Sequence, residues 1–119
     1  TNLVGKKNKP ILYYNDTSGL TIRDKNDIYG RIMLCNVTNS LIDNVSVIDG
    51  DGITLYHTDN ITVTNSKLNL STGVGCIIWY SSNITIKDNQ FFNSNDDNIN
   101  LCGAKHNLIE NNTLSSPVK

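Results

Sequence analysis

The sequence predicts an all-β fold in which short strands wind into a solenoid of about five coils. Three observations lead to this fold class. The 119 residues include 19 asparagines and only two prolines, a composition that is poor for helices and typical of frequent turns. Two stretches, Asn60–Leu68 and Asn83–Phe91, lie 23 positions apart, begin with the same Asn-Ile-Thr and match in polar or apolar character at the other six positions. Within each stretch the apolar residues alternate, as they do in half-buried strands.

The repeat divides the chain into rows at 31–51, 52–74, 75–97 and 98–119, preceded by a weaker row at 10–30. Aligned on one another, the rows place apolar residues in shared columns: Ile32/Leu34, Ile53/Leu55, Cys76/Ile78 and Ile99/Leu101; Ile42, Val63, Ile86 and Ile109; Val47, Leu68, Phe91 and Leu114. A single coil cannot bury these side chains, so like residues must stack at the strand spacing of about 4.8 Å. We therefore predict a right-handed parallel β-helix.

A ladder of Asx residues is expected at one bend of every coil. Between the second and third apolar columns the four rows carry Asn44, Asn65, Asp88 and Asn111. Side chains of this type bond backbone groups in turns and tolerate left-handed geometry. We expect these residues to have a structural role, and the amides of Asn65 and Asn111 to be buried and bonded to the backbone of adjacent coils.

The length predicts one domain, residues 1–119, with a β-helix as its only unit. Both ends of such a stack expose strand edges that normally require a cap. Since no polar helix or charged cap is visible at either terminus, we expect a fragment of a longer surface protein, with other domains of that protein among its partners. The alternative is that the first ten residues and the last few serve as caps. The chain carries 10 Lys+Arg and 11 Asp+Glu, so nucleic-acid binding is not expected. No apolar run approaches the roughly 20 residues that span a bilayer, so membrane insertion is not expected either.

The rows resemble a known family. The runs "GITLYHTDNITVTNS", "GCIIWYSSNITIKDNQF" and "NINLCGAKHNLIENNTL" are similar to the NosD-like repeats, of the carbohydrate-binding and sugar-hydrolase type, in the pectin-lyase-like superfold. The resemblance covers residues 9–116. It implies an extracellular or cell-surface protein of archaeal or bacterial type, with a polysaccharide or another cell-envelope component as partner. The superfold includes lyases, hydrolases and inert surface proteins, so the resemblance implies no single activity.

Asp51, Asp96 and Asp97 are the candidate catalytic residues. The Asp96–Asp97 pair resembles the adjacent aspartates of polygalacturonases, although the Gly-His-Gly and Arg-Ile-Lys segments of those enzymes are absent. Asp51 falls in the column of Asp97 two coils away, hence about 9–10 Å, near the upper limit for an inverting carboxylate pair. The competing interpretation is that turn geometry alone selects these aspartates. A polysaccharide-active enzyme is therefore the alternative function.

Tyr56, Trp79 and Tyr80 are the candidate saccharide-binding residues. They fall in neighbouring outward columns of adjacent coils, and exposed aromatic rings on a flat β face stack on the apolar face of a pyranose. The competing interpretation is packing against a flanking loop or a neighbouring domain. Together these observations favour a structural or saccharide-contacting module over a self-sufficient enzyme.

Two further patterns concern modification and metals. Seven Asn-x-Ser/Thr sequons, at Asn15, Asn36, Asn44, Asn60, Asn69, Asn83 and Asn111, predict a glycoprotein if the chain is exported. The three cysteines fall in different coils and are expected to be free thiols. No cofactor and no metal site is expected, because the usual ligand spacings are missing.

Overall fold

The computed structural model describes residues 9–70, 74–92 and 98–114. These residues form strands and no helix, so none of them makes a helix that could span a membrane. The strands are β1 (Ile11–Ser18), β2 (Thr21–Asn26), β3 (Arg31–Ile48), β4 (Gly52–Tyr56), β5 (Asp59–Thr64), β6 (Lys67–Asn69), β7 (Cys76–Trp79), β8 (Ser82–Lys87), β9 (Gln90–Phe92), β10 (Ile99–Cys102), β11 (Leu108–Glu110) and β12 (Thr113–Leu114).

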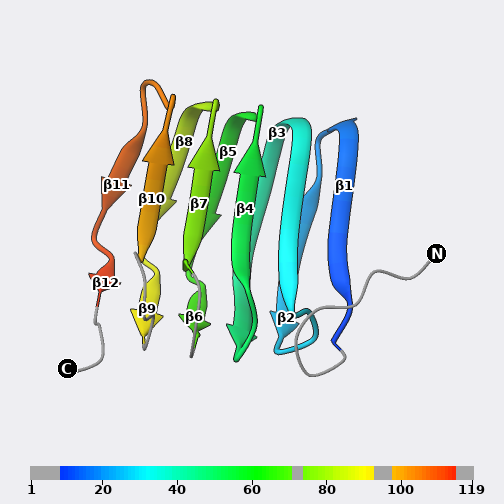
Figure 1. The fold of residues 1–119 in the computed structure, drawn as a ribbon, viewed down its shortest axis with the longest axis vertical. Coiled ribbons are helices and arrows are strands. Elements are labelled where there is room, and N and C mark those ends of the chain that lie inside the picture. The colour runs from blue at the N-terminus through cyan, green and yellow to red at the C-terminus, as the bar shows by residue number, and fades with distance from the viewer. Residues whose placement is uncertain (1–8, 71–73, 93–97, 115–119) are drawn as a thin grey trace.

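The strands wind into a solenoid with three faces. The first face carries β1, the start of β3, β4, β7 and β10; the second carries β2, the middle of β3, β5, β8 and β11; the third carries the end of β3, β6, β9 and β12. Every pairing is parallel and joins one coil to the next. Figure 1 shows the first face in front and the second behind it, with β6 and β9 below. The predicted all-β, right-handed parallel β-helix of about five coils is confirmed.

The register of the strands reproduces the predicted apolar columns. Ile53 pairs with Ile32 on one side and with Cys76 on the other, and Cys76 pairs with Ile99. The columns that contain Val63 and Leu68 align in the same way on the second and third faces. The inward side chains form one continuous core through the middle coils, where they are almost completely buried.

The corners between faces are made by residues in the left-handed conformation. The first corner has two such columns: Asp16, Asn36, His57, Tyr80 and Gly103, then Gly19, Asn39, Asn60, Asn83 and His106. The second corner has one: Asp24, Asn44, Asn65, Asp88 and Asn111. Asn and Asp enter this conformation at lower energetic cost than most residues, because their short polar side chains bond locally. This requirement explains much of the asparagine content.

The last described coil leaves its apolar side chains exposed. Leu101, Ile109 and Leu114 are between 41% and 51% exposed, although they lie in columns whose members one coil earlier are at most 1% exposed. The other end of the stack carries a charged contact, in which Lys9 pairs with Asp27 and donates to the carbonyl oxygen of Ile48. The two ends of the described stack therefore differ in polarity.

Candidate functional site

Tyr56, Trp79 and Tyr80 lie together at one edge of the first face. Tyr56 and Trp79 end β4 and β7 and are direct partners in the parallel register. Tyr80 follows Trp79 and occupies the left-handed bend, so its ring projects beside the other two. The three side chains are 37%, 41% and 53% exposed. We call these three residues together with His57 the aromatic strip.

Three rings of the aromatic strip, those of Tyr56, His57 and Tyr80, contact one another. His57 and Tyr80 stack with centroids 5.5 Å apart and an interplanar angle of 18°. Tyr56 meets both rings edge to face, with centroid distances of 4.3 Å to His57 and 5.9 Å to Tyr80. Edge-to-face and offset arrangements are the favoured geometries of aromatic pairs. The rings therefore hold each other in place without being buried.

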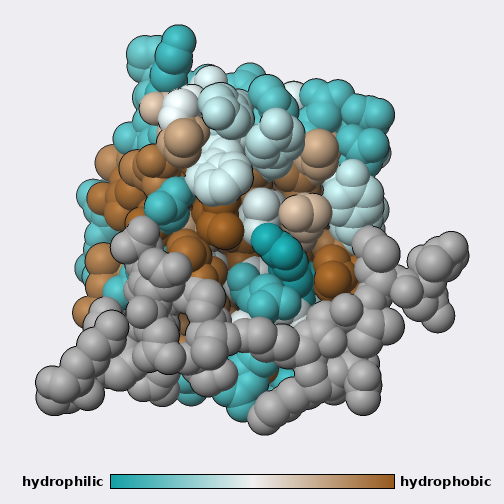
Figure 2. Space-filling view, in the orientation of Figure 1, coloured by the Kyte–Doolittle hydropathy of each residue, from teal (hydrophilic) through white to brown (hydrophobic). Residues whose placement is uncertain are grey.

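Two residues of the last described coil support the strip. The indole Nε1 of Trp79 donates a hydrogen bond to Asn100 Oδ1 at 2.9 Å. Gly103 lies against the ring of Tyr80, where a Cβ atom would approach Cδ1 to 2.8 Å, and it has a φ of +62°. Any other residue there would displace the Tyr80 ring. In Figure 2, pale side chains of intermediate hydropathy gather over the upper ends of β4 and β7.

The candidate catalytic aspartates are described only in part. Asp51 is half-buried just before β4, and its backbone N–H donates to the carbonyl oxygen of Gly30 at 2.6 Å. Asp96 and Asp97 lie outside the described residues. The predicted pairing of Asp51 with Asp97 therefore stays a prediction.

The three cysteines are free, as expected. Cys35 and Cys102 share a column with Tyr56 and Trp79 between them, whereas Cys76 is buried in the core. Burial raises the pKa of the Cys76 thiol to about 12. Across the described ranges, no three His, Cys, Asp or Glu side chains are grouped so that they could hold a metal ion.

Asp88 at the second corner is half-buried, but Asn65 and Asn111 are exposed, so the prediction that their amides are buried is wrong. Asn65 Nδ2 donates to Asp43 Oδ1 at 3.0 Å and Asn111 Nδ2 donates to Asp88 Oδ1 at 2.5 Å. The Asn65 amide, followed by the Arg23 guanidinium, holds the pKa of Asp43 below its usual value. A residue in a left-handed bend projects its side chain outward, so the inward position is the next one along the chain.

That next position carries an inward polar ladder of Ser66 and Asn89, which are buried, and Asn112, which is half-buried. Asn89 Oδ1 accepts from the Ser66 N–H and its Nδ2 donates to the carbonyl oxygen of Val63, both at 2.9 Å. Asn112 repeats both bonds one coil later, toward Asn89 and Ile86. At this bend the backbone amide has no strand partner, so a side-chain oxygen of the following coil satisfies it. The sequence signal was the Ser-Asn-Asn column itself, one residue beyond the predicted ladder.

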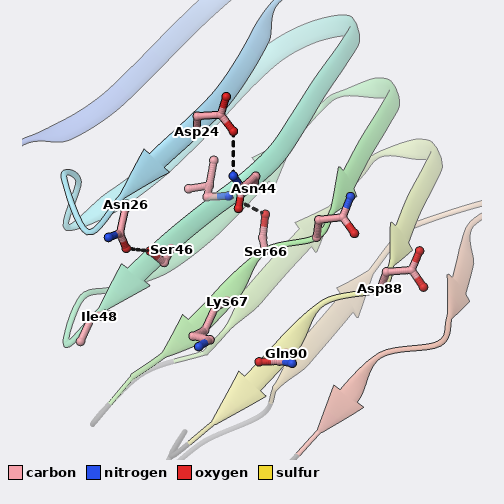
Figure 3. Close-up of a pocket in the computed structure, with 11 residues that line it drawn as sticks. Asp24, Asn26, Asn44, Ser46, Ile48, Ser66, Lys67, Asp88 and Gln90 are labelled. Carbon is pink, nitrogen blue, oxygen red and sulfur yellow. Dashed lines mark hydrogen bonds between the residues drawn. The ribbon is translucent and has the colours of Figure 1, made fainter.

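A polar groove also runs along the second corner. It encloses about 610 Å³ and lies between two rows of side chains. One row is the bend column Asp24, Asn44, Asn65 and Asp88; the other is the outward column Asn26, Ser46, Lys67 and Gln90. Figure 3 shows the two rows side by side, crossing successive strands. Sequence reasoning missed this groove because it treated the bend column as buried and took no account of the outward column two positions later.

The comparisons with known proteins bear on the whole chain. The family model for the right handed beta helix region matches residues 8–116. The chain belongs to this family. No curated protein and no solved structure gives a significant match. Membership of the right-handed β-helix family shows that the chain is a β-helix module. What the module binds must be inferred from its surface.

Proposed function

We propose that this β-helix is a module of an exported cell-surface protein, of the NosD-like branch of the pectin-lyase-like superfold, and that its aromatic strip contacts saccharide. The observation that carries the proposal is the exposed cluster of Tyr56, Trp79 and Tyr80 on two adjacent coils. Aromatic faces of this kind match the apolar face of a pyranose ring. The repeated rows and the sequons support the NosD-like and surface assignments.

The aromatic strip is ordered before any ligand arrives. The hydrogen bond from Trp79 to Asn100 and the ring contacts of Tyr56 with His57 and Tyr80 restrict the rings. A ligand that stacks on ordered rings loses less side-chain entropy on binding than one that must order them. Because Asn100 is half-buried beside the indole, the strip combines apolar ring faces with a polar edge.

Three variants test the proposal on a glycan array with a reducing-sugar assay. Trp79→Ala should keep the fold and weaken binding to cell-wall or exopolysaccharide fragments about tenfold, because one stacking contact is lost. Tyr13→Ala is the matched control, since Tyr13 is an equally exposed tyrosine outside the strip. Asp97→Asn should leave binding unchanged, since in this proposal that carboxylate only shapes a turn.

The outcomes separate the candidate functions. Release of reducing ends from uronic-acid polymers that Asp97→Asn abolishes would replace the proposal with the enzyme alternative. Loss of binding in Tyr13→Ala as well as in Trp79→Ala would show a nonspecific effect and contradict the strip. A wild-type chain that neither binds nor cleaves any glycan would leave the strip as a packing surface for another domain.

A further inference from the structure

We infer that the polar groove at the second corner is a second binding site, separate from the aromatic strip, for a neutral oligosaccharide that runs along the coil axis. The groove crosses successive coils between the bend column and the outward column of the third face. All of its lining residues belong to described strands and bends. The two rows differ in hydrogen-bonding character, and this difference identifies the ligand.

The bend column presents acceptors to the groove. Asp24 and Asp88 each have one carboxylate oxygen engaged, by Asn44 at 2.7 Å and by Asn111 at 2.5 Å, which leaves the second oxygen of each. The series of side-chain hydrogen bonds along the bend column is interrupted between Asn44 and Asn65, because Asn65 donates to Asp43 instead. The Oδ1 atoms of Asn44 and Asn65 therefore receive no hydrogen bond from any described residue. This row offers outward-facing oxygen atoms over four coils.

The outward column presents donors. Asn26 Oδ1 accepts a hydrogen bond from the Ser46 hydroxyl, which leaves the Asn26 amide N–H groups available. The side chains of Lys67 and Gln90 are exposed and form no hydrogen bond or ion pair with the described residues. Lys67 contributes an ammonium group with three donors, and Gln90 contributes an amide. A row of donors therefore faces a row of acceptors.

A chain of sugar rings satisfies both rows at once. Each hydroxyl is one donor and two acceptors, so it can donate to the bend column while accepting from the outward column. Neutral rings fit the charge of the groove, because two carboxylates, Asp24 and Asp88, outnumber the single ammonium of Lys67. A uronic-acid chain would place its carboxylates beside these two like charges.

Other polymers fit the groove poorly. Peptides are usually recognised by a free strand edge, an apolar groove, an aromatic-lined groove or an arginine cluster. Here the strands that form the floor, β6 and β9, already pair within the stack, and the lining contains no aromatic residue and no arginine. Nucleic acids require several Lys or Arg contacts to phosphate, and the lining offers one lysine against two aspartates.

Titration of the ¹⁵N-labelled chain with short neutral oligosaccharides of glucose, mannose, galactose and xylose tests the inference by NMR. Oligogalacturonate and an extended polar peptide serve as comparison ligands. At least one neutral sugar should shift the amides of residues 44–46, 65–67 and 90. Lys67→Ala and Gln90→Ala should each weaken that binding about three- to tenfold, through the loss of one or two hydrogen bonds.

Lys87→Ala is the charge-matched control, because Lys87 is an exposed lysine on β8 that does not line the groove. Lys87→Ala should bind the neutral sugar as tightly as the wild type does. Trp79→Ala should also show the wild-type shifts of the groove amides. The inference is overturned if no neutral sugar shifts the groove amides, if the Lys67→Ala and Gln90→Ala variants bind like wild type, or if only oligogalacturonate or the peptide binds. Groove binding without strip binding would reject the function proposed above and leave this inference standing.

Discussion

Asparagine side chains perform two different tasks at adjacent positions of the second corner. Asn65 occupies the left-handed bend and is exposed, so its contribution is a tolerated backbone conformation and one hydrogen bond at the surface. Asn89, one position further in its coil, is 1% exposed and bonds backbone groups through both ends of its amide. An asparagine at the inward position therefore contributes much more to stability than an asparagine at the bend position one residue earlier.

Asn89→Ala should lower the free energy of unfolding by about 2–4 kcal/mol, since the Ser66 N–H and the Val63 carbonyl lose their partner in the interior. Urea unfolding followed by circular dichroism measures this loss. Asn65→Gly is the control and should lose less than about 1 kcal/mol, because glycine keeps the left-handed bend. Equal losses in the two variants would contradict the assignment of Asn89 as the buried member.

At the scale of strands, periodicity was sufficient to predict the faces and their register. A slip of one residue would expose an entire apolar column, so the alternation around Ile42, Val63 and Ile86 permits a single alignment. The outward positions carry no such penalty. For this reason Tyr56 and Trp79 could be placed as neighbours, whereas the contacts of His57 with Tyr80, and the groove, depend on side-chain directions that alternation does not specify.

The strands of the last described coil should exchange their amide hydrogens faster than those of the middle coils. β5 and β8 have a partner strand on each side, whereas β11 pairs only with β8 among the described strands. In a stacked repeat each coil is stabilised by its neighbours, so opening should begin at the less supported end. Hydrogen exchange followed by NMR should show protection in β5 and β8 at least about tenfold above that in β11. Uniform protection would instead mean that the whole stack opens as one unit.

For the molecule as a whole, one continuous core makes stability sensitive to any charge that develops inside it. Burial raises the pKa of the Cys76 thiol from its ordinary value of 9.0 to about 12. Below pH 9 the thiol is neutral in both the folded and the unfolded chain. Between pH 9 and 12 the unfolded chain loses this proton and the folded chain keeps it, so stability falls as pH rises, by about 1.4 kcal/mol per unit from this group.

Urea unfolding at pH 8 and at pH 10.5 tests this dependence. Cys76→Ala should be less stable than wild type at pH 8 because of the cavity it creates. Between pH 8 and pH 10.5 its free energy of unfolding should fall by about 2 kcal/mol less than that of wild type. Cys102→Ala, at an exposed position, should keep the wild-type dependence. Identical slopes in all three proteins would show that the Cys76 thiol ionises within the folded core.

The one-coil register has a consequence for how such a chain can change in length. The segment from Gly52 up to Gly75 advances the chain by one coil, because Arg31 pairs with Gly52 and the strand that begins at Gly52 pairs with the strand that follows Gly75. If residues 52–74 were deleted from the gene, Gly75 would follow Asp51 and pair with Arg31. The apolar columns of the remaining coils would then stay aligned. Removing a single residue from a strand would instead turn its inward side chains outward. Copying or deleting whole circuits is therefore the route by which a molecule of this kind can grow or shrink and still fold.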